Sequence, residues 1–135
     1  MKKLIVSAFL FTATLGFSQV TMQVEVKGLK NNNGMVMIGV YNSEGTFLKK
    51  TYKGRAATIK NNKATTTFAD LPVGEYAVSV YHDENSNHKL DVNFMGIPKE
   101  KYASSNGAKG FMGPPKYADA HFKITENKTI VIKID

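Results

Sequence analysis

The sequence lacks cysteine and tryptophan entirely, and Arg55 is the one arginine among its 135 residues. Without cysteine, the chain can form no disulfide bond, no cysteine-ligated metal site, no thiol nucleophile and no cysteine-linked lipid. Its formal charge of +7 therefore comes almost wholly from lysine. Because bidentate recognition of phosphates and bases favours arginine, we attribute this charge to solvation or to weak attraction to an anionic surface, and we expect no nucleic-acid partner.

One long apolar run, residues 4–17, follows a short basic head at the start of the sequence. Small residues precede a cleavage point between Ser18 and Gln19, which completes the three-part pattern of a secretory signal peptide. The run of about 14 residues is shorter than the roughly 20 that a membrane-spanning helix needs. We therefore expect residues 1–18 to be removed and residues 19–135 to form one exported domain, periplasmic or extracellular, with no transmembrane span.

Alternation of apolar and polar side chains predicts half-buried strands at residues 20–26 and 36–40. The segment 28–34 between them is rich in asparagine and glycine and predicts a turn, so that the two strands should form a hairpin. The next stretch, residues 42–63, is punctuated by glycine and asparagine and predicts a loop or a short edge strand.

Further strands are predicted at residues 64–68, 76–82, 120–124 and 129–134. No segment after the apolar run carries the 3.6-residue stripe of an amphipathic helix. The predicted fold class is therefore all-β: a single antiparallel β-sandwich of about seven strands, immunoglobulin-like or transthyretin-like, with a small closed barrel as the alternative.

The alternating pattern breaks down at residues 93–118, where glycine and proline are frequent. This density of strand and helix breakers predicts a long irregular loop, and such loops are often functional or disordered. Tyr102, Phe111, Met112 and Tyr117 give the segment apolar anchors, so we expect an ordered crossover packed on one end of the sandwich.

An acidic and amide-rich segment, residues 83–91, directly follows the predicted 76–82 strand. Oxygen-bearing side chains occur at its first, third, fifth and ninth positions, which is the ligand spacing of the first part of an EF-hand-type calcium loop. Ca²⁺ prefers six to eight oxygen ligands, and alternate residues of a tight turn can point at one centre. The predicted ligands are Asp83, Asn85, Asn87 and Asp91, together with the backbone carbonyl of Lys89.

The segment departs from the calcium-loop pattern at two positions. His88 stands where the pattern has glycine, so it would have to adopt the positive φ itself. Phe94 stands where the pattern has its bidentate carboxylate. A nearby acidic side chain would have to replace that ligand: Glu84, Asp91 or Glu100. Such a site should be weak, about 10⁻⁴–10⁻³ M, and the alternative is that the same side chains form Asx turns without a cation.

Two other classes of function are open for the same end of the molecule. A hydrolase would use His82, Asp83 and Glu100 as its acid and base groups, although no nucleophile-type serine motif accompanies them. A carbohydrate-binding module would stack sugars on three tyrosines that we expect to be exposed, which are Tyr41, Tyr81 and Tyr102.

Several spaced motifs together resemble one family. They are Phe68-x-Asp70-Leu71-Pro72-x-Gly74-x-Tyr76, His82-Asp83-x-Asn85-x-Asn87-x-Lys89-Leu90-Asp91, Gly96-x-Pro98-x-Glu100 and Gly113-Pro114-Pro115. Over residues 20–134 the chain resembles the bacterial exported domain-of-unknown-function family 2141. The resemblance implies a secreted or periplasmic β-sandwich and no established activity. It spans both the 83–91 segment and Glu100, which favours one site formed from the two.

Residues 68–76 alone are also similar to a turn of transthyretin-like and carboxypeptidase-regulatory-like sandwiches. The related hydrolases end in Tyr-Arg-Gly-Ser, and residues 131–135 of this chain lack that motif, so the likeness implies no such activity. We therefore expect an exported, non-enzymatic binding or structural module. Ca²⁺ is its candidate cofactor, and an envelope or extracellular polymer is its candidate partner.

Overall fold

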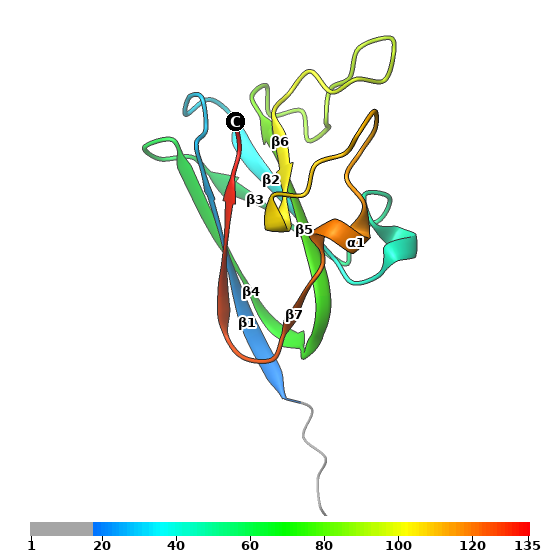
Figure 1. Cartoon of the computed structure of the whole chain (residues 1–135). Coiled ribbons are helices and arrows are strands. Elements are labelled where there is room, and N and C mark those ends of the chain that lie inside the picture. Colours follow the sequence, from blue (N-terminus) through cyan, green and yellow to red (C-terminus); the bar gives the residue numbers. More distant parts are fainter. Residues whose placement is uncertain (1–17) are drawn as a thin grey trace, which may run out of the picture.

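Two β-sheets pack face to face in the computed structural model, which describes residues 18–135 (Figure 1). The first sheet has three strands, in the order β4 (Lys63–Pro72), β1 (Gln19–Lys27) and β8 (Lys128–Lys133). The second has five: β3 (Lys53–Thr58), β2 (Met35–Tyr41), β5 (Gly74–Asp83) and β6 (Tyr102–Ser104) in order, with β7 (Phe122–Ile124) paired to the start of β5. The helical segments are short: η1 (Glu44–Thr46), η2 (Ser105–Gly107) and α1 (Tyr117–Ala120). The predicted all-β sandwich is confirmed, with eight strands within residues 18–135 where about seven were expected.

The core lies between the two sheets and includes the alternate residues that the sequence pattern marked. Val24 of β1, Ile38 of β2 and Val80 of β5 are all buried there. Because successive side chains of a strand point to opposite faces, each strand presents one apolar face to the other sheet. Burial of each such side chain contributes roughly 1.5–3 kcal/mol, and this term replaces the cross-links that the sequence lacks.

The predicted hairpin of residues 20–26 and 36–40 is wrong, because β1 and β2 belong to different sheets. β1 instead lies between β4, to which it is antiparallel, and β8, to which it is parallel. The chain leaves the first sheet at Gly28, whose φ is +82°, and a Cβ there would stand 2.7 Å from the carbonyl oxygen of Ile134. Only glycine combines that backbone conformation with so close an approach.

The glycine- and proline-rich crossover is ordered and contains β6 and η2. β6 pairs with residues 79–81 of β5 and β7 pairs with residues 74–76, so a short stretch of this edge of β5 lacks a strand partner. The Ser105 hydroxyl fills the gap, because its Oγ accepts the Val78 N–H at 3.0 Å and donates to the Ala120 carbonyl at 2.6 Å. One buried serine thereby fastens the crossover to both β5 and α1.

Replacing Ser105 by alanine should lower the free energy of unfolding by about 1–3 kcal/mol, because a buried N–H and a buried carbonyl lose their partner. Ser104→Ala is the matched control. The Ser104 Oγ is buried and has no hydrogen-bond partner. Its removal should therefore leave the stability unchanged or raise it. Urea unfolding measures both variants, and equal losses in the two would contradict the assignment.

The acidic loop and the adjoining groove

Strand β5 ends on two neighbouring side chains that point in opposite directions. His82 points between the sheets, is 1% exposed, and its Nε2 lies 2.7 Å from the carbonyl oxygen of Asn33. Asp83 lies on the outer face of the sheet and is nevertheless 0% exposed, since the residues that follow fold over it. The two groups therefore do not face one another, although they are adjacent in sequence.

The acidic loop, residues 83–91, closes around the Asp83 carboxylate. Oδ1 of Asp83 accepts the backbone N–H of Asn87 at 3.2 Å, and Oδ2 accepts that of His88 at 2.8 Å. The side-chain oxygens of Asn85 and Asn87 each accept the N–H two residues further along, at 3.2 and 3.0 Å. The Asx turns that the sequence left open as the alternative are therefore present.

Two residues of the acidic loop adopt the left-handed conformation. Their φ values are +55° at Ser86 and +62° at His88. His88 stands at the position where a calcium loop has glycine, and it takes the backbone angle that the sequence pattern required of it. A side chain with a Cβ pays a steric cost of about 1–2 kcal/mol in this region of φ.

The amide side chains of the acidic loop converge on a second carboxylate, that of Asp91. Asn85 Nδ2 donates to Oδ2 of Asp91 at 2.8 Å, and Asn87 Nδ2 donates to Oδ1 at 2.7 Å. These hydrogen bonds, that from Asn87 first, lower the pKa of Asp91 and favour its ionised form. Lys89, predicted to offer its carbonyl, lies on the same turn and donates its backbone N–H to Asn87 Oδ1. The fold thus brings the predicted ligand residues together, with amide nitrogens facing Asp91.

Glu100 reaches the acidic loop from the returning arm of the crossover. The backbone N–H of Lys99 donates to the Asp91 carbonyl at 2.8 Å, and the Asp91 N–H donates to Glu100 Oε2 at 3.4 Å. Burial raises the pKa of Glu100, and the negative charges of Asp91 and Asp83 raise it further. The two segments that the sequence analysis joined into one site therefore do meet.

Carboxylates and histidines alone do not form a metal site. No group of three or more His, Cys, Asp or Glu side chains within residues 18–135 is close enough together to hold an ion. Glu84, another candidate for the missing ligand, lies instead 4.0 Å from His82 Nδ1. A cation in the acidic loop would therefore need the amide oxygens of Asn85 and Asn87, each of which keeps a second lone pair.

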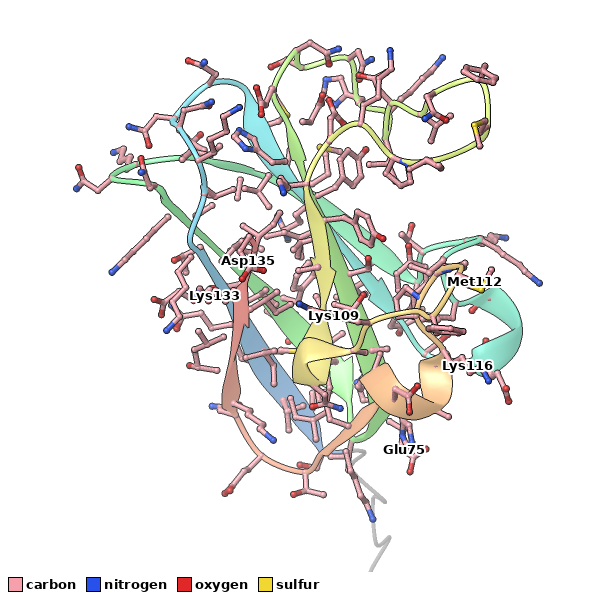
Figure 2. The ribbon with its side chains drawn as sticks, turned by 45° about the horizontal axis from the view of Figure 1, so that its top comes forward. Glu75, Lys109, Met112, Lys116, Lys133 and Asp135 are labelled. Carbon is pink, nitrogen blue, oxygen red and sulfur yellow. The ribbon has the colours of Figure 1, made fainter. Side chains whose placement is uncertain are left out.

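A groove of about 1040 Å³ lies beside the acidic loop, over β2, β5 and β6. The three tyrosines predicted as a sugar-stacking platform all line it. The prediction that Tyr41 is exposed is wrong, because it packs against Phe47 and is only 8% exposed. Its two walls are residues 90–98 and 112–115, and no charged side chain lines it. Met112 and Lys116 lie on the loop of the second wall, just before α1 (Figure 2). The tyrosines are Tyr41, Tyr81 and Tyr102.

The two walls are the feature that strand periodicity did not identify. Residues 94–98 read Phe-Met-Gly-Ile-Pro, and residues 111–115 read Phe-Met-Gly-Pro-Pro. This repeated Phe-Met-Gly-x-Pro pattern is the signal in the sequence that could have indicated two turns of similar composition. Both segments contribute residues to the lining of one groove.

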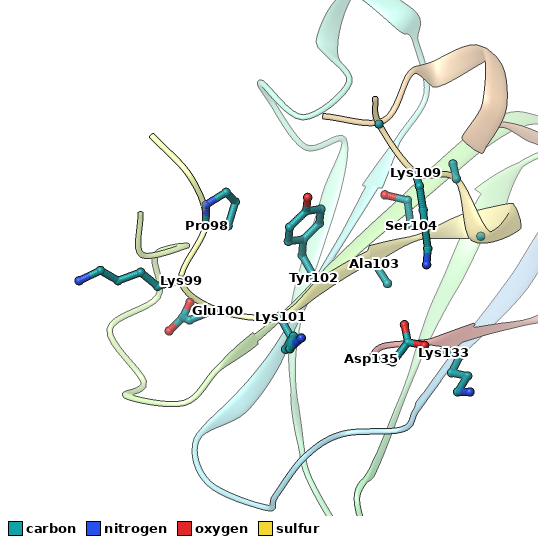
Figure 3. A pocket seen from close by; sticks show the side chains of 13 residues that line it. Pro98, Lys99, Glu100, Lys101, Tyr102, Ala103, Ser104, Lys109, Lys133 and Asp135 are labelled. Atoms are coloured by element: carbon teal, nitrogen blue, oxygen red, sulfur yellow. The ribbon is translucent and has the colours of Figure 1, made fainter. Parts of the chain in front are cut away.

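Glu100 also lines a smaller cavity of about 390 Å³ along β6, with Glu100 toward one end and Asp135 toward the other (Figure 3). No histidine lines this cavity, and His82 is buried between the sheets. The acid and base groups predicted for a hydrolase therefore do not share a cleft. The remaining charged lining residues are Lys99, Lys101, Lys109 and Lys133.

Replacing His88 by glycine should stabilise the fold by about 0.5–1 kcal/mol, because glycine adopts the observed positive φ without the Cβ clash. His88→Ala is the matched control, since it removes the imidazole but keeps Cβ, and it should bring no gain. Thermal melting compares the two variants. An equal gain in both would assign the effect to the imidazole and contradict the backbone explanation.

No helix within residues 18–135 is long and apolar enough to cross a membrane. The predicted signal peptide, residues 1–18, falls almost wholly outside the described part of the chain.

Comparison with known proteins identifies a family to which the chain is similar. No curated protein and no solved structure matches the chain. The model of a family described as "Uncharacterized protein conserved in bacteria (DUF2141)" matches residues 24–132, a range that includes the acidic loop and Glu100. The chain therefore belongs to the bacterial DUF2141 family, as its motifs indicated.

Proposed function

We propose that this chain is an exported, non-enzymatic binding or structural module that takes up Ca²⁺ in its acidic loop. The observation that carries the proposal is the convergence of Asn85, Asn87 and Glu100 on Asp91. These groups come from two separate segments that the fold joins at one end of the sandwich. Extracellular calcium modules bind at about 10⁻⁴–10⁻³ M, which is the range expected of a loop with these departures from the strong pattern.

The charge distribution supports a cation at this point. Asp83, Asp91 and Glu100 bring three acidic groups to one end of the sandwich. Burial is the main cause of the raised pKa of Glu100, and the charges of Asp91 and Asp83 add to it. The Asp91 carboxylate accepts hydrogen bonds from two side-chain amides, and each amide N–H carries only a partial positive charge. A divalent ion would offset the repulsion between the carboxylates more fully than the amides do.

The chemistry of the donor set also fits calcium. Carboxylate, amide and backbone carbonyl oxygens are the hard ligands that Ca²⁺ takes in a flexible geometry. Within residues 83–91 the softer donor is the imidazole of His88, which is exposed. Bound calcium would supply charge neutralisation there and would link Glu100 to the acidic loop. The ion would be held by oxygen atoms of Asp83, Asn85, Asn87, Lys89 and Asp91.

The two alternative functions have weaker support. A hydrolase needs its acid and base groups within hydrogen-bond reach of a substrate, and His82 is buried against the Asn33 carbonyl. A carbohydrate-binding module has the three tyrosines of the groove in its favour. The remaining polar side chain that lines the groove is Ser79, which leaves few groups to orient sugar hydroxyls. Binding of an envelope or extracellular polymer therefore stays a proposal that rests on the three tyrosines.

Calcium should raise the melting temperature of the protein. At ten times the dissociation constant, one bound ion stabilises the folded state by about 1.4 kcal/mol. Magnesium should act more weakly, because it demands near-octahedral geometry and gives up its water reluctantly. Differential scanning fluorimetry with up to about 10 mM of each ion, well above the expected range of dissociation constants, measures both shifts. No shift with calcium would contradict the proposal.

The variant Glu100→Gln separates two effects of that side chain. The pKa of Glu100 is raised in the folded protein, so ionisation of this side chain lowers the free energy of unfolding. This loss is absent below the pKa that Glu100 has in the unfolded chain, and it is complete above the pKa that it has in the folded protein. At pH 7 without calcium the variant should melt no lower than the unmodified protein, while its calcium-induced shift should shrink. The exposed Glu126, changed to glutamine, is the matched control and should alter neither value. A full calcium shift in Glu100→Gln would remove Glu100 from the site.

A further inference from the structure

The two walls of the groove end in apolar side chains that nothing in the described chain covers. Phe94 is 97% exposed, and Phe111 and Met112 are each 92% exposed. Met95 and Ile97 are also exposed. These side chains belong to the two turns that contribute to one groove. Exposed apolar patches on soluble proteins often mark sites of protein or membrane interaction.

The first wall holds its exposed side chains in a braced turn. Asn93 Oδ1 accepts the N–H groups of Met95 at 2.9 Å and of Ile97 at 3.0 Å. The Asn93 N–H donates to the Ile97 carbonyl, and the Gly96 N–H donates to the Asn93 carbonyl, both at 2.9 Å. The exposure of Phe94 is therefore imposed by a hydrogen-bonded turn and is not caused by a frayed chain.

The second wall holds its tip in an uncommon backbone conformation. Met112 has a φ of +54°, in the left-handed region that long side chains without a turn preference seldom adopt. Such a conformation costs free energy and persists only where the surrounding chain imposes it. Pro114 and Pro115 follow within three residues, and the second of these is buried. The exposure of Phe111 and Met112 is thus also imposed by the backbone around them.

Lysines adjoin, in sequence, several of the segments that line the apolar groove. Exposed lysines flank three of the segments that line it: Lys49 follows Leu48, Lys89 and Lys99 flank residues 90–98, and Lys116 follows residues 112–115. Residues 101–118 contain no aspartate or glutamate. These four lysines outnumber Asp91 and Glu100, the acidic residues that lie within or next to the same segments. An uncharged, apolar centre with a net positive rim is complementary to an anionic lipid surface.

We propose that the paired Phe-Met-Gly-x-Pro turns dock the protein on an anionic bilayer surface. Phe94, Met95, Phe111 and Met112 enter the boundary between head groups and acyl chains while the lysine rim contacts the head groups. A protein partner fits less well, because lysine is depleted at protein interfaces. A sugar polymer fits less well because the groove offers few polar side chains. This docking goes beyond the proposed calcium uptake and does not require it.

Sedimentation with vesicles, in a buffer that contains EDTA, tests the docking independently of calcium. The protein should partition onto phosphatidylglycerol–phosphatidylcholine vesicles and much less onto phosphatidylcholine alone. The double variant Phe94→Ser, Phe111→Ser should lose about tenfold or more of the partition coefficient. The double variant Val73→Ser, Val131→Ser is the matched control, because these exposed valines lie away from the groove, and it should bind normally. Raising the salt from about 0.1 to 1 M should weaken binding as the Debye length falls.

Tryptophan emission locates the contact, because the sequence has no tryptophan of its own. Phe94→Trp and Phe111→Trp should each shift to shorter wavelength when anionic vesicles are added, and Val131→Trp should not. Three results would overturn the proposal. They are vesicle binding that survives Phe94→Ser, Phe111→Ser; no emission shift at either turn; and a dimer in solution that this double variant dissociates, which would make a second copy the occupant.

Discussion

Burial of the Asp83 carboxyl group is the constraint on which the rest of this end of the molecule depends. A carboxyl group without solvent exposure is tolerated only where hydrogen bonds replace its water, and Asp83 obtains them from the N–H groups of Asn87 and His88. To deliver both, the chain must turn back within one short loop, and His88 takes a positive φ in doing so. The same turn directs two amide side chains toward Asp91. The geometry of the acidic loop thus follows from one buried group at the end of β5.

The acidic loop and the groove are consecutive parts of one chain segment. From Asp91 the chain forms the first wall of the groove and returns through Lys99, whose N–H donates to the Asp91 carbonyl. Glu100 then meets the loop just before β6 begins to pair with β5. A cation that linked Glu100 to the loop would therefore also stiffen the base of the wall that carries Phe94. The calcium proposal and the membrane proposal rest on different side chains but share this framework.

The sequence predicts the positions of the strands better than it predicts their partners. Alternation identified the core faces of β1, β2 and β5, because a half-buried strand needs that period. It could not show that β1 pairs with β8 instead of β2, since both pairings bury the same side chains. β6 forms because it pairs with β5, since its own residues show no strand pattern. The strand expected at residues 120–124 begins only at Phe122, after the helical turn α1. The ligand spacing predicted that the loop side chains converge, but not which amide atoms would face Asp91.

The central claim is that the acidic loop and Glu100 form one cation-binding unit, and a high-resolution crystal structure grown with calcium tests it most directly. The account predicts a density peak within the loop, bonded to Asp91 and Glu100 oxygens at about 2.3–2.6 Å, with the Asn85 and Asn87 amides turned to present oxygen. The contradicting result is a loop without such density, in which both amide nitrogens still donate to Asp91 or the carboxylates point outward into water.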